Sequence, residues 1–290
     1  LLLILLINIK YIIMNNLSIN FVNNSDKWNN FILNSSSPNI INHSIFLDSW
    51  GTKKFFIKKN REILAGFSLF EENKTISLSE NLLYTPLVYR NYKNIPVSSI
   101  TNDKHIIINS LAEFLIKEKF SGEIRFDHFT TDMRPFLWKN FDFNKKLFVI
   151  SDIKYTSILN ISNLQINDFE NSDFFKSMSV RTRQSYRYSV KRKKYIVKSY
   201  FDKQLIKNLI NLTYKRQSKK IEFDIDKHLD ILEKLQEEKL LESYVCEDEK
   251  GEILSKVIFG LNSDYATFLH GARSGKDSGN DYSMVYLLIY

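Results

Sequence analysis

Apolar and polar residues follow one another along the chain in runs that predict strands and helices in a recurring order. From residue 17, the strand-like runs lie at 17–22, 53–59, 60–70, 75–84, 122–129, 145–152 and 154–161. Helical spacing predicts short helices at 28–33, 43–50 and 133–140, and an amphipathic helix at 104–120. The last of these carries Ile108, Leu111, Leu115 and Ile116 on one face. This mixture of elements is typical of an α/β or α+β domain.

A second round with a similar order begins at Tyr195. It gives a strand at 195–201, a helix bearing Leu205, Ile206, Leu209 and Ile210, a helix at 226–239, a hairpin at 241–248 and 251–261, a strand at 265–272 and a terminal apolar helix. Compared with the first round, the second lacks a strand, a helix and the closing strands. We therefore expect a C-terminally incomplete sequence, with a genuine terminus at a docked apolar helix as the alternative.

The two predicted hairpins share a short phrase. Glu62-Ile63-Leu64-Ala65 aligns without a gap on Glu252-Ile253-Leu254-Ser255, at an offset of 252 − 62 = 190 residues. A preceding strand-like run accompanies each copy. The pattern therefore predicts an internal repeat in which both hairpins hold the same place in their sheets.

Composition limits the class of protein. The chain has 290 residues, 43% hydrophobic and 26% charged, which is globular rather than disordered composition. The one cysteine, Cys246, excludes an internal disulfide framework and fits a reducing compartment. No cysteine and histidine residues stand at metal-ligand spacing, so we expect no metal site.

Residues 1–13 form a hydrophobic run without a positive n-region or a small-residue cleavage site, and Lys10 interrupts it. Because Met14 opens an ordinary polar start, we expect residues 1–16 to be a spurious or flexible extension. A true membrane anchor is the alternative. No other segment reaches the ~20 apolar residues of a membrane span. The sequence therefore predicts a cytoplasmic protein without stable membrane insertion.

Several loose motifs resemble a known family by their order and spacing. In the first half they are HSIFLDSW, REILAGFSLF and LLYTPLVY; in the second half they are SVRTRQSYRYSVKRKKY, LINLTYKRQSKK, GEILSKVIFG, YATFLHGARS and SGNDYSMVYLLIY. Together they resemble a Fem-type (FemAB-like) acyltransferase with two tandem domains of GNAT fold and mixed central sheets. The resemblance implies a first domain at 17–160, a connecting segment with a basic helix at 161–194, and an incomplete second domain at 195–290.

The resemblance also implies an activity. Fem-type relatives move an amino acid from aminoacyl-tRNA to the amine of a cell-wall precursor peptide. We therefore expect an N-acyl or aminoacyl transferase that binds no permanent cofactor, takes aminoacyl-tRNA or acyl-CoA as donor and acts on a cell-envelope or polysaccharide precursor. An acyl-CoA-dependent sugar N-acetyltransferase and a non-catalytic RNA-binding protein are the alternatives.

The basic helix concentrates the charge of the chain. Residues 180–195 contain seven basic residues and no acidic one, so the formal net charge of +8 falls to 8 − 7 = +1 without them. On a helix, Arg183, Arg187 and Lys191 make one cationic stripe, and Arg181 lies nearby. Such a helix suits the phosphates of tRNA, a diphosphate-linked precursor or CoA, with Tyr186 and Tyr188 stacking on bases or sugars. A solvated helix whose arginines pair with carboxylates is the alternative.

A glycine loop follows the strand at 265–272. Gly271, Gly275 and Gly279 precede a helix start at Ser283, an arrangement that can aim backbone N–H groups at an anion of the donor. In GNAT relatives the corresponding loop holds the CoA pyrophosphate through an Arg/Gln-x-x-Gly-x-Gly/Ala pattern. Counted from Arg273, the first expected glycine falls on Lys276, which weakens the case for CoA. A merely mobile loop is the alternative.

Direct attack by an acceptor amine requires no covalent nucleophile, and the sequence shows no Ser-His-Asp or Cys-His constellation. The resemblance makes Arg216 a clamp for donor or acceptor. It places His270 beside the acyl site, either as an acceptor of the amine proton or as a structural histidine. Asp127 and His128, at the end of a first-domain strand, are expected to bind the acceptor or to be surface residues.

Overall fold

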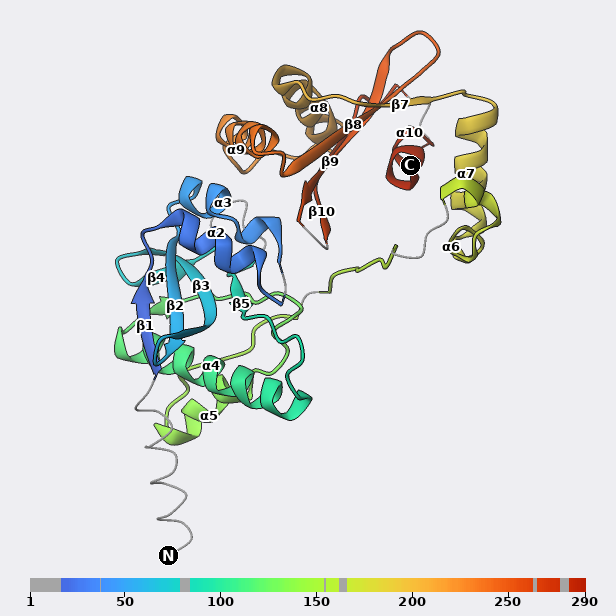
Figure 1. Ribbon diagram of the computed structural model, residues 1–290. Helices are drawn as coiled ribbons and strands as arrows, with labels where there is room; N and C mark the ends of the chain where they lie inside the picture. Colours follow the sequence, from blue (N-terminus) through green and yellow to red (C-terminus); the bar gives the residue numbers. More distant parts are fainter. Residues whose placement is uncertain are drawn as a thin grey trace, which may run out of the picture. The chain divides into compact units, whose positions relative to one another are not determined.

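The computed structural model describes residues 17–36, 38–78, 84–153, 155–161, 166–262, 265–276 and 282–290 (Figure 1). The expected extension at 1–16 lies outside the described residues. The chain divides into two compact units. The first holds the described residues of 1–156 with 262–265, and the second holds those of 157–261 with 266–290. The basic helix is therefore part of the second unit.

The first unit is built on a mixed sheet. Its strands are β1 (Leu17–Phe21), β2 (Lys53–Lys59), β3 (Glu62–Glu72), β4 (Thr75–Ser77), β5 (Leu87–Tyr89) and β6 (Ser121–Gly122). The order is β1-β2-β3-β4-β6, and β5 pairs with β3. All described pairs are antiparallel except β4 with β6. The predicted first strand, first hairpin and mixed sheet are confirmed.

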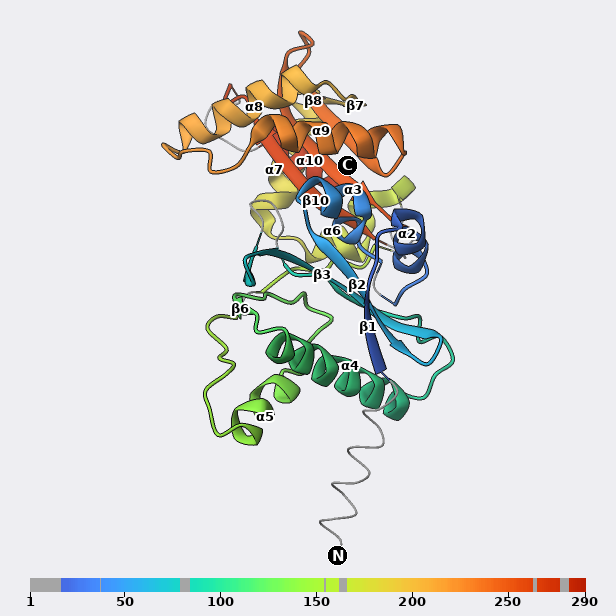
Figure 2. The same cartoon turned by 90° about the vertical axis from the view of Figure 1, so that its left-hand side faces the viewer.

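Helices cover both faces of this sheet (Figure 2). On one side lie α2 (Ser25–Leu33), the 3-10 turn η1 (Ile40–Asn42) and α3 (Ser44–Ser49); on the other lie α4 (Val97–Lys117) and α5 (Arg134–Asp142). Successive residues of β3 face opposite sides of the sheet, so the strand contacts both helix layers. Phe67 packs against Phe114 of α4, and Gly66 lies under the indole of Trp28 from α2. Helix α4 begins before its predicted start at 104, directly after Pro96.

The predicted strand at 122–129 is wrong beyond Gly122. This glycine has φ +116°, a conformation that favours glycine, and a Cβ atom there would lie 1.9 Å from the carbonyl oxygen of Ile76. The pairing of β6 with β4 ends at this residue. In the described residues of 145–152 and 154–161, no strand forms either. An alternating sequence fits a pleated surface, but a strand also needs a partner edge, which local sequence does not supply.

The second unit has four described strands, β7 (Ile196–Ser199), β8 (Leu241–Glu247), β9 (Ile253–Leu261) and β10 (Ala266–Arg273), in the order β10-β9-β8-β7. Every described pair in this sheet is antiparallel, so among the described residues the mixed pairing is confined to the first unit. The connections explain this, because each one returns the chain beside the strand it has just left.

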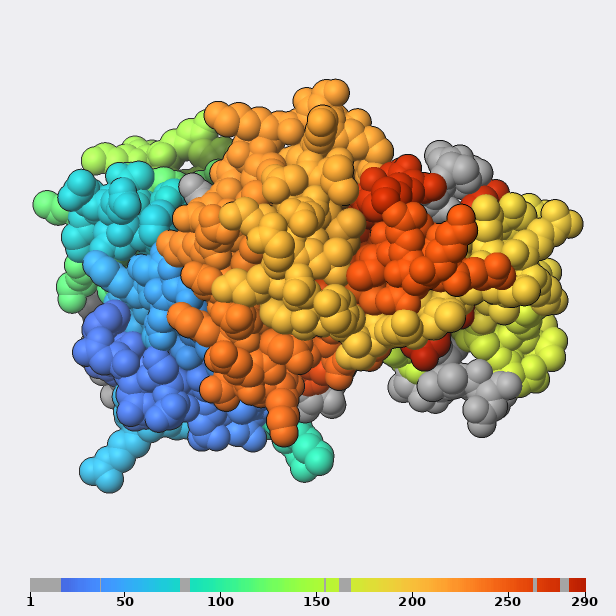
Figure 3. Space-filling model, turned by 90° about the horizontal axis from the view of Figure 1, so that it is seen from above, coloured from blue at the N-terminus to red at the C-terminus, as the bar shows by residue number. Residues whose placement is uncertain are grey.

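Helices α8 (Lys203–Arg216) and α9 (Ile225–Glu237) lie side by side on one face of this sheet (Figures 1 and 2), joined by the ion pairs of Lys203 with Asp230 and Glu233. Both segments lie on the surface that Figure 3 shows. The other face carries α10 (Tyr282–Ile289), which packs against α7 (Val180–Lys191). The 3-10 turn η2 (Ile166–Asn171) and α6 (Asp173–Ser177) precede α7.

The two hairpins occupy the same place in their sheets. The arrangement β1-β2-β3-β5 in the first unit matches β7-β8-β9-β10 in the second. The registers also break at matching points. In the first hairpin, Ile57 pairs with Ala65 and Lys58 pairs with Ile63, so Leu64 is an extra residue in β3. In the second, Cys246 pairs with Ser255 and Glu247 pairs with Ile253, so Leu254, 190 residues after Leu64, is an extra residue in β9. Because a bulge is a specific backbone feature, its recurrence indicates that the short phrase marks a structural repeat.

In the part of the chain that the structure describes, no helix combines the length and the apolarity needed to cross a bilayer.

Candidate functional site

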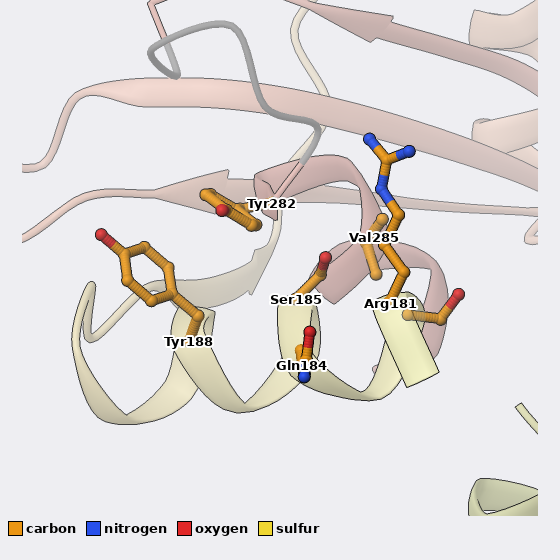
Figure 4. A pocket seen from close by; sticks show the side chains of 7 residues that line it. Arg181, Gln184, Ser185, Tyr188, Tyr282 and Val285 are labelled. Carbon is orange, nitrogen blue, oxygen red and sulfur yellow. The ribbon is translucent and has the colours of Figure 1, made fainter. Parts of the chain in front are cut away.

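A cavity of about 490 Å³ lies between α7 and α10 (Figure 4). Five of its lining residues come from α7 and two from α10; they are Arg181, Thr182, Gln184, Ser185, Tyr188, Tyr282 and Val285. Arg181 lies at one end in Figure 4, and the Tyr188 and Tyr282 rings lie at the other, with centroids 4.7 Å apart. The lining therefore offers one guanidinium group, several neutral hydrogen-bonding groups and an aromatic surface.

The sequence of α7 explains how this cavity is held. Ser179 caps the helix by accepting a hydrogen bond from the backbone N–H of Thr182. The buried Ser189 hydroxyl lies 2.8 Å from the carbonyl of Ser185 and 3.1 Å from that of Tyr282, within reach of both. Because serine is small, α10 approaches α7 closely at this point and the cavity opens beside it.

The stripe of Arg183, Arg187 and Lys191 lies away from the cavity, and none of its members is among the lining residues. Arg187 pairs with Glu170, with 2.8 Å from Nε to the carboxylate, and lies over the ring of Phe175. Tyr186 packs against Phe175 and other rings, and this burial raises its pKa. Of the two tyrosines predicted to stack on a ligand, only Tyr188 lines the cavity.

Arg216 and the glycine loop are brought together. The Nη1 group of Arg216 donates to the carbonyl of Arg273 at 3.3 Å. Gly275 has φ +83°, and a Cβ there would lie 3.1 Å from the same Nη1. The hydroxyl of Thr213, one turn earlier on α8, donates a hydrogen bond to the carbonyl of Arg273 and accepts one from its backbone N–H. The end of α8 therefore fixes the chain as it leaves β10.

The remaining loop residues differ in their placement. Gly271 lies within β10 rather than in the loop, and a Cβ there would lie 2.7 Å from the ring of Phe268, so this glycine makes room inside the sheet. Ser283 is fully buried in the first turn of α10. Lys276, where the CoA pattern expects glycine, forms an ion pair with Glu252. Gly279 lies outside the described residues.

His270 is enclosed by its own unit. Its ring lies 6.0 Å from that of His228 on α9, and its Nε2 atom is buried without a hydrogen-bond partner among the described residues. Burial first, and the neighbouring His228 second, lower the pKa of His270 to about 4. A neutral imidazole with so low a pKa is a weak base near pH 7, which favours the structural role over proton acceptance.

Asp127 lies in the first unit, after β6 and not at the end of a strand as expected. The residue is 8% exposed, and its carboxylate accepts a hydrogen bond from the N–H of Phe129 at 3.0 Å. Burial raises its pKa, although the hydrogen bond to Phe129 acts in the opposite direction. The ring of His128 lies against that of Phe129. A carboxyl group with a raised pKa exchanges its proton closer to neutral pH.

Sequence reasoning missed Lys256. This residue is 2% exposed in the middle of β9, and its Nζ donates to the carbonyl of Tyr200 at 2.9 Å, beside the rings of Tyr200 and Phe201. Burial lowers its pKa to about 8. One signal was visible, since Lys256 interrupts an otherwise apolar strand.

The architecture defines a mixed α/β protein with two sheets that share a hairpin arrangement. Two solved structures have a similar architecture. The structure of FemX is 13% identical and superposes with a TM-score of 0.56, over 94% of this chain and 85% of that chain. The structure of L-PGS from Bacillus licheniformis is 14% identical, with a TM-score of 0.52 over 92% of this chain and 70% of that chain. No protein-family model matches the sequence, and no curated protein is detectably similar to it.

These likenesses establish the fold. The chain has a Fem-type fold, as the motifs in its sequence predicted.

Proposed function

We propose that this chain is an acyltransferase of Fem type that transfers an aminoacyl group to an amine of a cell-envelope or polysaccharide precursor. The observation that carries the proposal is the structural match to FemX, which extends over 94% of the chain and so includes both units. A fold alone does not select a reaction, so the described residues must also suit acyl transfer.

Aminoacyl transfer to an amine needs positioning more than it needs a nucleophilic side chain. The nitrogen of the neutral acceptor amine attacks the carbonyl carbon of the donor ester, an N–C bond forms, and the C–O bond to the donor breaks. The amine loses a proton, and the departing donor hydroxyl gains one. Holding the two reactants in contact supplies much of the rate. The cavity beside α7 and the Arg216 region offer positioning groups, and Asp127 remains a candidate for the acceptor's amine.

The donor we favour is aminoacyl-tRNA. Two observations support it over acyl-CoA: the loop after β10 departs from the CoA pattern at Lys276, and that lysine is engaged with Glu252. Arg181 lines the cavity beside α7 and gives an anionic donor a positively charged partner there.

The test is a transfer assay with the full chain. Radiolabelled aminoacyl-tRNA and acetyl-CoA are offered separately, with an extract of envelope precursors and with a synthetic amine-bearing peptide as acceptors. Label released from tRNA and recovered on the acceptor would support the proposal. Transfer from acetyl-CoA alone would favour the sugar N-acetyltransferase alternative. Salt-sensitive RNA binding without any transfer would favour the non-catalytic alternative.

A further inference from the structure

The residues of α7 divide between two faces. At about 100° per residue, Arg181, Tyr188 and the C-cap residue Arg192 fall within about 40° of one another, whereas Arg183 and Arg187 lie on the far side. We call the first set the cavity face, and the pair of Arg183 and Arg187 the outer face. The sequence assigned phosphate binding mainly to the stripe that includes the outer face, because its charges recur at regular spacing.

The cavity face continues to the end of the helix. A second cavity, of about 320 Å³, adjoins the end of α7 and includes Arg192, Lys193 and Lys276 in its lining. Arg192 and Lys193 each lie 5.8 Å from the centre of the Tyr188 ring, which lines the first cavity. Tyr188 therefore lines the first cavity and approaches two residues that line the second, with Arg181 before it and Arg192 after it along the helix.

The acidic residues that line the second cavity each have a partner, either a lysine side chain or backbone N–H groups. Glu252 pairs with Lys276, and Glu249 pairs with Lys194. The carboxylate of Asp248 accepts the backbone N–H groups of Lys250 and Glu252. An anion that enters beside Arg192 therefore meets carboxylates that already have partners.

The spacing of these groups selects the kind of ligand. About 16 Å of helix separates Arg181 from Arg192, at about 1.5 Å per residue, which exceeds the reach of a single phosphate. A ligand that meets both needs two separated anionic groups and, between them, a flat or ring-shaped part that suits Tyr188 and Tyr282. Bases stack on tyrosine, and arginine forks two hydrogen bonds to phosphate.

We infer that the cavity face binds a phosphate-bearing nucleotide portion of the acyl donor, with Arg181 and Arg192 on phosphates and the Tyr188–Tyr282 pair against a base or ribose. This inference deepens the proposed function and rests on it. The two candidate donors, aminoacyl-tRNA and acyl-CoA, have one group in common: each contains an adenosine nucleotide, at the 3′ end of tRNA and in CoA. The outer face is then a solvated and structural surface, as the pairing of Arg187 with Glu170 illustrates.

The experiment measures the binding of two probes to the full chain. One is a fluorescein-labelled single-stranded RNA of about twelve nucleotides ending in cytidine, cytidine and adenosine, long enough to span one binding groove; the other is CoA, followed by calorimetry. Arg181→Ala and Arg192→Ala are compared with Arg183→Ala and Arg187→Ala, which remove the same charge from the outer face. Circular dichroism and thermal unfolding verify that all four variants fold.

We expect each cavity-face variant to weaken binding about tenfold, the equivalent of one lost charge-assisted hydrogen bond. For the RNA, the log–log salt slope falls by about 0.7 per phosphate contact removed. The two outer-face variants should stay within about twofold of wild type. Tyr188→Ala should weaken binding about tenfold as well, and Tyr188→Phe should retain it, because stacking needs the ring and not the hydroxyl.

The outcomes separate the inference from the proposed function. Equal weakening by all four variants, weakening by the outer-face pair alone, or no binding of either probe to wild type overturns the inference. None of these results bears on transfer, which the assay of donor and acceptor measures independently. Selective loss with RNA identifies an RNA donor, and selective loss with CoA identifies a CoA donor; both support the cavity face.

Discussion

The buried lysine of β9 makes stability depend on pH in a direction that can be tested. The side chain of Lys256 lies inside the second unit with the carbonyl of Tyr200 as acceptor. Burial lowers its pKa to about 8 from an ordinary 10.5, and the charge of Asp202 acts in the opposite direction. Between these two pKa values the unfolded chain holds a proton that the folded chain has released.

The consequence is a stability that rises with pH. Because the unfolded state binds more protons between about pH 8 and 10.5, raising the pH through this window favours the folded state. The difference of 10.5 − 8 = 2.5 units corresponds to about 3.4 kcal/mol at about 1.36 kcal/mol per unit. Residual solvent screening around the amine reduces this to about 2 to 3 kcal/mol.

The perturbation is Lys256→Met, which keeps an unbranched side chain and removes the titrating group. At about pH 7 the variant loses the bond to Tyr200, worth about 1.5 to 3 kcal/mol, and also escapes the burial of a charge, so the two changes nearly cancel. At pH 10.5 the folded wild-type protein no longer carries that buried charge. The variant should then be less stable than wild type by about 2 to 3 kcal/mol.

Urea unfolding followed by circular dichroism, at intervals from about pH 7 to about pH 10.5, measures this difference. Subtracting the variant from wild type at each pH removes the contribution of tyrosines, which titrate in the same window. Lys198→Met, at an exposed lysine of β7 paired with Glu247, is the control and should show little pH-dependent difference. A difference between wild type and Lys256→Met that stays constant across this range would refute the buried, depressed amine.

Three further predictions concern other parts of the chain. Gly122→Ala should destabilise the first unit by about 1 to 3 kcal/mol in urea unfolding, and more than Gly251→Ala destabilises the second, because both have positive φ but only Gly122 meets a carbonyl oxygen; equal losses would contradict this reason. Wild type should lose stability as the pH falls from 6.5 towards 4, because the pKa of His270 is lowered to about 4 and the unfolded state takes up the proton first; His270→Gln should reduce that loss, and an unchanged acid profile contradicts it. Arg187→Ala should lower the free energy of unfolding by less than about 1 kcal/mol, since its ion pair is partly exposed; a larger loss would show that the Phe175 contact dominates.

Local pattern was sufficient for elements with strong periodicity or clear end signals. The hairpins, α8 and α9 follow from their apolar spacing, and Asp202 and Asp224 cap the two helices where that spacing begins. The start of α4 was missed, because residues 97–103 carry no apolar period and only Pro96 marks the boundary. The strand at 122–129 was overpredicted, since the partner of Gly122 in the sheet is Ile76, which is 122 − 76 = 46 residues earlier, and the pairing ends there.

The candidate site also depends on residues distant in the sequence, which local pattern does not predict. The sequence located the basic helix and its charge, and it singled out Arg216 and Gly275, which the structure brings together. It did not identify which side of α7 faces a cavity, because that depends on the packing of α10, a helix distant in the sequence. Regular spacing of charge shows that residues share a face, and only the tertiary partner shows whether that face is the functional one.

The two hairpins of the repeat carry different residues at one equivalent position. Gly66 in the first hairpin and Lys256 in the second are equivalent by the offset of 190 and by their places in matching registers. At Gly66 the missing side chain admits the indole of Trp28, whereas Lys256 fills the same position with its own chain and reaches Tyr200. One backbone arrangement thus accepts an aromatic ring from a helix or an amine from the strand itself. Because the backbone tolerates both, the repeated phrase predicts the fold of each unit, and the residues that differ between the two copies must be examined individually for chemistry.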